Sequence, residues 1–286
     1  MVGAKEPEKA ENQAFPRGQA MPSQSPIFWV QQKDRYLRQL LIKDIEQLTD
    51  RRLIVYFANR FQDAQIDQGD VAYVAELIGD LNGAPTDLLL ETNGGFTDAT
   101  ESVVSLLQAV IPDMRVIVVN AAKSNGTMIC LAASEIVMGP TSELGPIDPQ
   151  LNGTPASILS QDVIAEQNYP LHQLAVYAIK QTVKLAHRLL QKGMMSDEEP
   201  ARIEAAVAAL SSREVFFSHG SVIDHNEARQ LGLKVKYLDQ NDELWQRLWL
   251  LHCMYAHDLN RNSYLKVFEG AHRSTSVAAP FNSNGG

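Results

Sequence analysis

The segment from residue 115 to residue 139 constrains the fold most, because it places a serine between a buried strand and a helix. Residues 116–119 form a continuous run of apolar, β-branched side chains, which is typical of a strand buried in a parallel sheet. Ser124 follows shortly after it, small and apolar residues then predict a helix, and residues 136–138 return to strand. The first backbone amides of this helix would be free to donate hydrogen bonds to an anion formed at Ser124. That position suits a serine nucleophile, although on this segment alone an ordinary N-cap is the better interpretation.

A second strand and turn strengthen the functional interpretation. Residues 87–91 form another apolar strand, and Gly94 and Gly95 follow it closely. Two glycines after a buried strand allow the backbone to turn sharply and to approach a ligand closely. Because the carboxyl ends of parallel strands meet at one edge of a sheet, the two turns are expected to lie side by side. The sequence therefore predicts an oxyanion hole formed by the Gly95 and Asn125 N–H groups in front of Ser124.

Four motifs in this order resemble the serine dehydrogenase proteinase family: NGG at 93–95, AKSNGT at 122–127, AASEIVMGP at 132–140 and SELGPIDPQ at 142–150. That family is a branch of the Clp protease and signal peptide peptidase A group, whose members share the crotonase-type fold. The resemblance covers about residues 53–238. It implies an α/β protein with a Clp protease/crotonase-like fold of repeated ββα and βαβ units and an ATP-independent serine peptidase activity. One departure is Asn125, which stands where the family usually has alanine, so the resemblance leaves open a changed specificity or a weakened site.

The resemblance also implies a Ser–Lys dyad, in which Ser124 attacks and a lysine accepts its proton. Lys180, in a helix predicted over residues 170–193, aligns with a lysine-bearing helix of the family, and Lys184 one turn later is the second candidate. A lysine acts as a base only where burial lowers its pKa enough to leave it neutral. The other interpretation is that both lysines are solvated surface residues.

Two further residues are candidates for the site. His219 precedes a predicted helix and would act as a substitute base or a substrate contact, or would simply fix its turn. Asp148, in the loop of residues 139–152, is either an orienting carboxylate or a residue that stabilises this loop before a proline. A Clp-type Ser–His–Asp triad is disfavoured, because no histidine occurs between Ser124 and His172, where Clp proteases carry theirs.

Charge and hydropathy argue against several other classes of protein. The net charge of −9 argues against nonspecific nucleic-acid binding, which needs clustered Lys and Arg. The longest apolar runs fall far short of the roughly 20 residues that span a bilayer, and residues 1–25 lack the apolar core of a signal peptide. Cys130 and Cys253 lie in apolar helical stretches and are expected to be buried thiols rather than a disulfide or metal site. The sequence thus predicts a cytoplasmic protein without a membrane span, metal or cofactor.

The chain is expected to form one peptidase domain with extensions at both ends. The predicted parts are a disordered tail (1–26), an N-terminal helical extension (27–52), the peptidase domain (53–240), a C-terminal helix (241–269) and a second disordered tail (270–286). Both terminal helices carry more apolar surface than one sheet needs, with Trp245 and Trp249 one turn apart. Crotonase-fold proteases generally work as closed assemblies, so a homo-oligomer, a trimer or a multiple of it, is expected.

Three functions remain open at this point. The first is a serine peptidase that cleaves peptides or unfolded proteins, with Ser124 as nucleophile and Lys180 as base. The second is an acyl-CoA-type crotonase enzyme, which also holds a carbonyl oxygen between two amides but has no use for Ser124. The third is a noncatalytic oligomeric scaffold that has lost its base. Labelling of Ser124 by a fluorophosphonate probe would separate the first function from the other two.

Overall fold

A mostly parallel sheet forms the centre of the molecule. The computed structural model describes residues 25–279, so most of the first predicted tail and the end of the second lie outside the described residues. Within that range the sheet has seven strands, in the order β11 (Ser274–Ala278), β10 (Tyr264–Gly270), β1 (Arg52–Ala58), β2 (Thr86–Glu91), β3 (Met114–Val118), β5 (Glu135–Met138) and β9 (Val235–Tyr237). In this sheet β1, β2, β3, β5 and β9 run parallel to one another. By contrast, β10 runs antiparallel to β1, and β11 runs antiparallel to β10.

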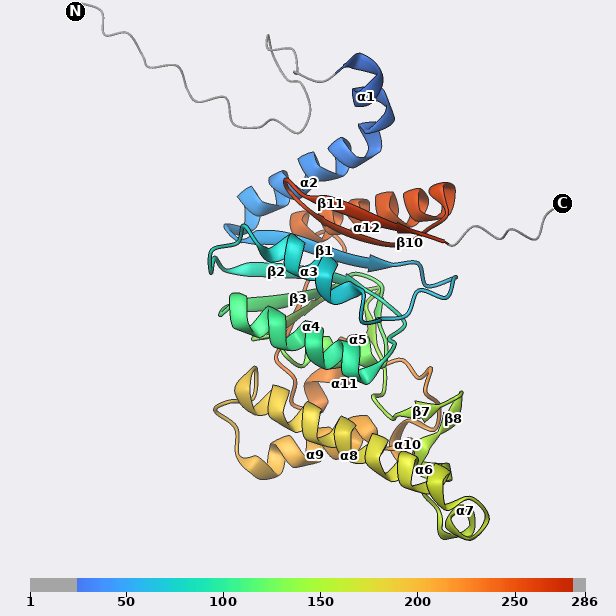
Figure 1. Cartoon of the computed structure of the whole chain (residues 1–286). Coiled ribbons are helices and arrows are strands. Elements are labelled where there is room, and N and C mark those ends of the chain that lie inside the picture. Colours follow the sequence, from blue (N-terminus) through green and yellow to red (C-terminus); the bar gives the residue numbers. More distant parts are fainter. Residues whose placement is uncertain (1–24, 280–286) are drawn as a thin grey trace, which may run out of the picture.

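Helices cover both faces of this sheet (Figure 1). One face packs against α3 (Asp70–Ile78), α4 (Thr97–Val110) and α5 (Asn125–Cys130), and the other against α2 (Lys33–Thr49) and α12 (Glu243–Asn262). Alternate residues of β1 point to the two sides: Ile54 and Tyr56 join the first core, and Val55 and Phe57 the second. Because both faces are buried, the central residues of β1, β2 and β3 are continuous apolar runs: 53–58, 88–90 and 116–118. The α/β fold predicted from the sequence is confirmed.

A further helical layer lies below the sheet in Figure 1 and is built mainly by α8 (Tyr169–Lys192) and α9 (Pro200–Ser211). The second half of α8 is fixed on the core by four buried residues, Leu185, Ala186, Leu189 and Leu190. Two short helices, α6 (Ala156–Leu159) and α7 (Asp162–Gln167), pack against α8. The other short elements are α1 (Pro26–Gln31), α10 (Arg213–Phe216), α11 (His225–Gln230) and the strands β4 (Ala121–Ala122), β6 (Glu143–Leu144), β7 (Gln150–Leu151) and β8 (Thr154–Pro155).

The C-terminal region differs from the prediction. Residues 264–278 form the β10–β11 hairpin, whereas a helix up to residue 269 and a disordered tail after it were expected. The register of β10 on β1 pairs Ile54 with Gly270. β11 is short, polar and partly exposed, so its own pattern does not indicate a strand. It becomes a strand by pairing with β10, which in turn pairs with the distant β1.

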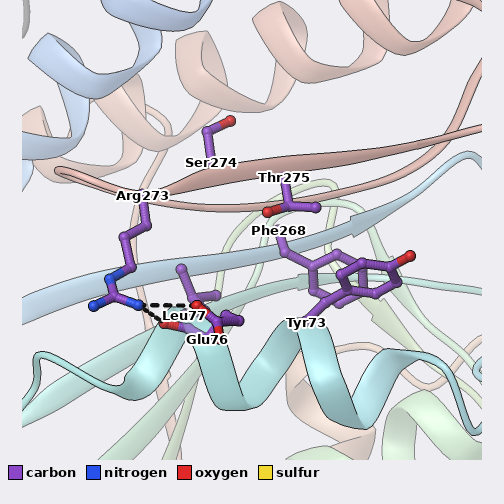
Figure 2. A pocket seen from close by; sticks show the side chains of 7 residues that line it. All are labelled: Tyr73, Glu76, Leu77, Phe268, Arg273, Ser274 and Thr275. Carbon is purple, nitrogen blue, oxygen red and sulfur yellow. Dashed lines mark hydrogen bonds and ion pairs between the residues drawn. The ribbon is translucent and has the colours of Figure 1, made fainter.

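The hairpin is also fixed by side chains on α3, as Figure 2 shows. Arg273 donates to the backbone oxygen of Glu76 at 2.7 Å and forms an ion pair with its carboxylate at 3.2 Å. Tyr73 stacks on Phe268 of β10, with ring centroids 5.1 Å apart. The hairpin is therefore an integral edge of the sheet.

Candidate active site

Ser124 occupies a strained turn at the carboxyl end of the parallel strands. Its backbone has φ 53° and ψ −120°, a conformation that L-residues rarely adopt and that costs on the order of 1–3 kcal/mol. Hydrogen bonds on both sides hold the turn: the Lys123 N–H donates to Thr92 O at 3.0 Å, and the Gly126 N–H donates to Lys123 O at 2.7 Å. Such a turn between a strand and a helix presents the serine Oγ to the space in front of the sheet.

The diglycine turn packs directly against the serine turn. Gly94 has φ +104°, and a Cβ on it would lie 2.8 Å from the Ser124 Cβ. A Cβ on Gly95 would lie 2.2 Å from the backbone nitrogen of Ile66. Ile66 holds the turn through its N–H to Gly94 O at 2.9 Å and accepts from the Phe96 N–H at 2.9 Å. Glycine is therefore required at both positions for the two turns to meet.

Two backbone N–H groups beside Ser124 are available to a ligand. Among the hydrogen bonds of residues 25–279, none is donated by the backbone N–H of Gly95 or of Asn125. The Asn125 side chain instead ties the two turns together, because its Nδ2 donates to Gly95 O at 2.6 Å and to Thr97 Oγ1 at 3.3 Å. Unused donors on rigid backbone are what an oxyanion hole needs.

A histidine–carboxylate pair lies in the same part of the molecule. His219 Nδ1 is 2.7 Å from Asp148 Oδ1, and Asp148 is buried. The second oxygen of Asp148 faces Arg213 at 3.5 Å. Sequence reasoning named His219 and Asp148 as separate candidates but did not pair them, since they lie 71 residues apart and are joined only by tertiary packing.

One cleft of about 740 Å³ brings these groups together. Gly95, Ser124, Asn125 and His219 all line it. Its other walls include residues 62–65 before α3, residues 150–153 around the β7–β8 turn, and Ala178, Gln181 and Thr182 of α8. The structure therefore collects the predicted nucleophile, both predicted oxyanion-hole residues and the predicted histidine in a single cleft.

The two candidate lysines lie elsewhere. Lys180 and Lys184 are both exposed on α8 and are not among the residues that line the cleft. Positions 178, 181, 182 and 185 share the inward side of α8, so helical geometry turns positions 180 and 184 away. The burial that a lysine base requires is absent at both positions in this structure.

Lys123 is buried but its ammonium is directed away from the cleft. Lys123 Nζ donates to Leu144 O and to Ser221 O, each at 3.0 Å, and lies 3.1 Å from Glu143 Oε2. Burial lowers the pKa of Lys123, while the Glu143 carboxylate opposes this shift.

Sequence reasoning did not single out Glu91 and His252. The Glu91 carboxylate accepts from Asn120 Nδ2 at 2.9 Å and from the Ala121 N–H at 3.1 Å, and burial raises its pKa to about 7. His252 Nδ1 lies 3.7 Å from Glu91 Oε2 and has no hydrogen-bond partner among the described residues. Burial lowers the pKa of His252 to about 4. The sequence signal that could have indicated Glu91 is its position at the end of a buried apolar strand.

The structure also bears on the predictions about the cysteines, metal binding and membrane spans. Cys130 is buried, but Cys253 is exposed on α12, so the expectation of two buried thiols is wrong for Cys253. Over residues 25–279, no three His, Cys, Asp or Glu side chains are grouped so as to hold a metal ion. None of the helices in this part of the chain is both long and apolar enough to cross a bilayer.

Two proteins of Methanocaldococcus jannaschii are similar to this chain in sequence. The uncharacterized protein MJ0137 is 33% identical over 158 residues, which is 53% of this chain and 53% of the relative. The uncharacterized protein MJ1495 is 27% identical over 157 residues, which is 53% of this chain and 52% of the relative. The chain thus spans about half the length of the curated relatives it matches.

Solved structures give a weaker likeness. A ClpP1 mutant from Listeria monocytogenes has a TM-score of 0.43 and 16% identity, covering 70% of this chain and 98% of its own. A mutant of the 1510-N membrane-bound stomatin-specific protease has a TM-score of 0.42 and 20% identity, covering 64% of this chain and 79% of its own.

A family model gives the broadest sequence match. It is the model of the ClpP-like SDH-type serine proteinases, and it matches residues 67–264. This range covers more than half of the chain and includes the serine turn, the diglycine turn and the His219–Asp148 pair. The chain therefore belongs to the ClpP-like SDH-type serine proteinase family.

Proposed function

We propose that the chain is a serine peptidase in which Ser124 is the nucleophile, His219 the general base and Asp148 the residue that orients the histidine. One observation carries the proposal: a strained serine, two unused backbone N–H groups and a carboxylate-bound histidine share one cleft. Nucleophile, base and orienting group are the parts that acyl transfer requires.

In the proposed reaction, Asp148 accepts a hydrogen bond from His219 Nδ1–H, which leaves Nε2 unprotonated and able to take the proton of the Ser124 hydroxyl. Ser124 Oγ then attacks the peptide carbonyl carbon. The negative charge that forms on the carbonyl oxygen is stabilised by the N–H groups of Gly95 and Asn125, each contributing about 3 kcal/mol when well aligned. His219 returns the proton to the leaving amine, and a water molecule activated by His219 hydrolyses the acyl-enzyme.

The Ser124–Lys180 dyad expected from the family resemblance is the rival assignment. It requires α8 to turn Lys180 toward the cleft and to bury it, because an exposed lysine stays protonated at neutral pH. His219, by contrast, already lines the cleft that contains Ser124. We therefore place His219 ahead of Lys180 and Lys184 as the base.

Peptides or unfolded proteins are the proposed substrates, cleaved without ATP. The cleft is large enough for an extended segment. Within the described chain, no Lys or Arg lines it, and its acidic side chains are Asp63 and Asp98. Coenzyme A carries phosphate groups that are usually met by basic side chains, so the acyl-CoA alternative has little support.

We also propose a homo-oligomer, a trimer or a multiple of it, located in the cytoplasm. Exposed apolar side chains on α8, among them Leu174 and Tyr177, provide a surface that a second copy would cover. Light scattering during size-exclusion chromatography tests the assembly, and a monomer of 31.7 kDa contradicts it.

The test of the function is labelling by a fluorophosphonate probe, combined with turnover of peptide and ester substrates. We expect the wild type to be labelled at Ser124, and Ser124→Ala to lose both labelling and turnover by at least about 10⁴-fold while keeping its circular dichroism spectrum. The matched control is Ser196→Ala, an exposed serine between α8 and α9. An unlabelled wild type, or full turnover by Ser124→Ala, rules the proposed function out.

A further inference from the structure

The residue before the nucleophile makes contacts that reach beyond its own turn. Lys123 is only 9% exposed, and its ammonium meets three acceptors: Leu144 O, Ser221 O and the Glu143 carboxylate. An ammonium has three N–H donors, so these contacts use all of them and favour the protonated lysine. Lys123 in this state cannot accept a proton from Ser124.

The stem of Lys123 is held as firmly as its head. A Cβ on Gly145 would lie 2.7 Å from Lys123 Cδ, so the side chain runs closely over this glycine. Beneath it, β4 pairs with β6, with Ala122 opposite Leu144. Leu144 in turn exchanges both backbone hydrogen bonds with Ile223. The ammonium therefore lies where the serine turn, β6 and the segment after His219 come together.

One of these contacts fixes the turn that carries the histidine. The turn of residues 218–221 is closed by the Ser221 N–H, which donates to Ser218 O at 3.1 Å. Lys123 Nζ holds the Ser221 carbonyl of this turn, and Asp148 holds the His219 ring. The position of His219 is thus set twice, once through its ring and once through the Ser221 carbonyl of its turn.

The contact with Glu143 connects Lys123 to the diglycine turn through Arg60 and Asn93. Lys123 contacts Oε2 of Glu143, and the other carboxylate oxygen, Oε1, lies 3.2 Å from the guanidinium of Arg60. Arg60 Nε donates to Asn93 Oδ1 at 2.7 Å, and Asn93 Nδ2 donates back to Arg60 O at 2.8 Å. Asn93 directly precedes Gly94 and Gly95. Lys123 is therefore linked to all three turns of the candidate site.

We propose that Lys123 is a positioning residue whose ammonium sets the turn of His219 against Ser124. This inference rests on the proposed function and assigns a role within the same site. It predicts that removal of the ammonium displaces His219 and leaves the sheet in place. The diglycine turn should move less than His219, because Lys123 reaches it only through Glu143 and Arg60.

The variant that isolates this role is Lys123→Met, which keeps an unbranched stem over Gly145 and removes the donors. We expect kcat for an ester substrate to fall about 10- to 100-fold, the effect of a misplaced catalytic group, with less than a threefold change in KM. Lys236→Met, at an exposed position of β9, is the matched control and should behave as the wild type.

A double-mutant cycle distinguishes positioning from a general structural role. In a His219→Ala background, Lys123→Met should slow fluorophosphonate labelling of Ser124 by less than twofold, because the group it positions is already gone. If Lys123→Met slows the labelling of Ser124 by the same factor in the wild-type and His219→Ala backgrounds, Lys123 does not act through His219 and the inference is overturned. Wild-type kcat in folded Lys123→Met overturns it as well.

A spectroscopic readout separates this inference from the proposed function. In the full chain with ¹⁵N-labelled histidine, the His219 ring resonances should shift in Lys123→Met and stay in place in Lys236→Met, whether or not the wild type hydrolyses peptides. Unchanged His219 resonances overturn the inference. If Lys123→Met does not fold, Glu143→Gln replaces it. We then expect a smaller shift of the His219 resonances and a three- to tenfold loss of kcat. Wild-type resonances together with a wild-type kcat in Glu143→Gln then overturn the inference.

Discussion

Two of the clusters of charged side chains in the described chain connect different kinds of structure. The cleft cluster consists of Lys123, Glu143, Arg60 and Glu91. It is named for the turns that it joins at the carboxyl ends of the strands, and none of its four members lines the cleft itself. Its contacts end on backbone groups and on the Asn93 and Asn120 side chains. The geometry of these turns is the geometry of the candidate active site.

The rear cluster consists of Arg38 of α2, Asp258 of α12 and Glu269 of β10. Arg38 forms ion pairs with both carboxylates, at 2.8 Å in the case of Glu269, and Tyr255 donates to Glu269 at 2.9 Å. All these partners are side chains on regular elements that pack together. The comparison indicates that buried charge stabilises the fold in the rear cluster and arranges loops in the cleft cluster.

After the loss of Ser124 itself, the largest expected effect concerns the base at the cleft. His219→Ala should lower kcat/KM by about 10²- to 10⁴-fold, because the proton of Ser124 then has no acceptor. Asp148→Asn should lower kcat/KM as well, because Asp148 orients the His219 ring. Lys180→Ala, on the exposed side of α8, should change kcat/KM less than twofold. Steady-state kinetics with an ester substrate measures all three. An active His219→Ala together with an inactive Lys180→Ala restores the dyad.

The next effect breaks the rear cluster. Arg38→Met leaves the Asp258 and Glu269 carboxylates without their cation, so the free energy of unfolding should fall by about 3–5 kcal/mol. Urea denaturation measures this loss, and kcat of the folded protein should stay at the wild-type value. The control is Arg261→Met, which breaks an exposed ion pair with Asp34 at 3.5 Å and should lower stability by less than about 1 kcal/mol. Equal losses in the two variants contradict the comparison.

A third effect tests the inner end of the cleft cluster by its pH dependence. Burial raises the pKa of Glu91 from 4.5 to about 7, so its contribution to stability is fully present below pH 4.5 and is lost as the pH rises toward 7. Burial lowers the pKa of His252 from 6.5 to about 4, so its contribution is present above pH 6.5 and is lost as the pH falls toward 4. Between pH 4.5 and 6.5 the two contributions change in opposite directions and largely cancel.

Single substitutions should expose each contribution separately. His252→Phe keeps the stacking on Phe57 and Trp249 but removes the titration, so stability should fall as the pH rises from 4.5 to 7. Glu91→Gln should show the reverse, with stability falling as the pH drops from 6.5 to 4. Each change should amount to roughly 3 kcal/mol at most. Urea midpoints across this pH range measure both, and two profiles parallel to the wild type contradict the assignment.

The smallest effect concerns Asn125, which departs from the alanine usual in the family. Asn125→Ala removes the 2.6 Å hydrogen bond to Gly95 O and so loosens one edge of the oxyanion hole. We expect kcat to fall about three- to tenfold, equivalent to roughly 1 kcal/mol. Asn226→Ala, at an exposed position of α11, is the control. A gain of activity in Asn125→Ala shows that the asparagine weakens the site.

The parallel core could be predicted from the sequence because its signals are local. Strands buried on both faces are continuous apolar runs, and parallel strands end at the same edge. The serine and diglycine turns could therefore be placed side by side, and the structure brings Ser124, Gly95 and Asn125 to one cleft. The strained backbone of Ser124 could not be foreseen, because no local sequence pattern indicates it and the turn is held by a hydrogen bond to Thr92, 31 residues from Lys123.

The parts that escaped prediction depend on distant contacts. His219 and Asp148 meet only after the helical layer has packed, so each could be named but not paired. The periodicity of α8 indicates an apolar stripe, but it does not tell which flank faces the cleft, and Lys180 lies on the outer one. The polar segment of β11 carries no strong strand pattern of its own, so the C-terminal hairpin was missed.

The attachment of the C-terminal hairpin to β1 has a consequence for synthesis on the ribosome. Ile54 pairs with Gly270, so β1 emerges more than 200 residues before the strand that completes its outer edge. Until then the nascent chain presents an apolar strand with unpaired backbone groups, which is a template for association with other chains. The serine and diglycine turns belong to segments made well before β10, so the candidate active site can start to assemble on an unfinished sheet. Synthesis of β10, rather than formation of the site, is then the step that ends the exposure of β1 to neighbouring chains.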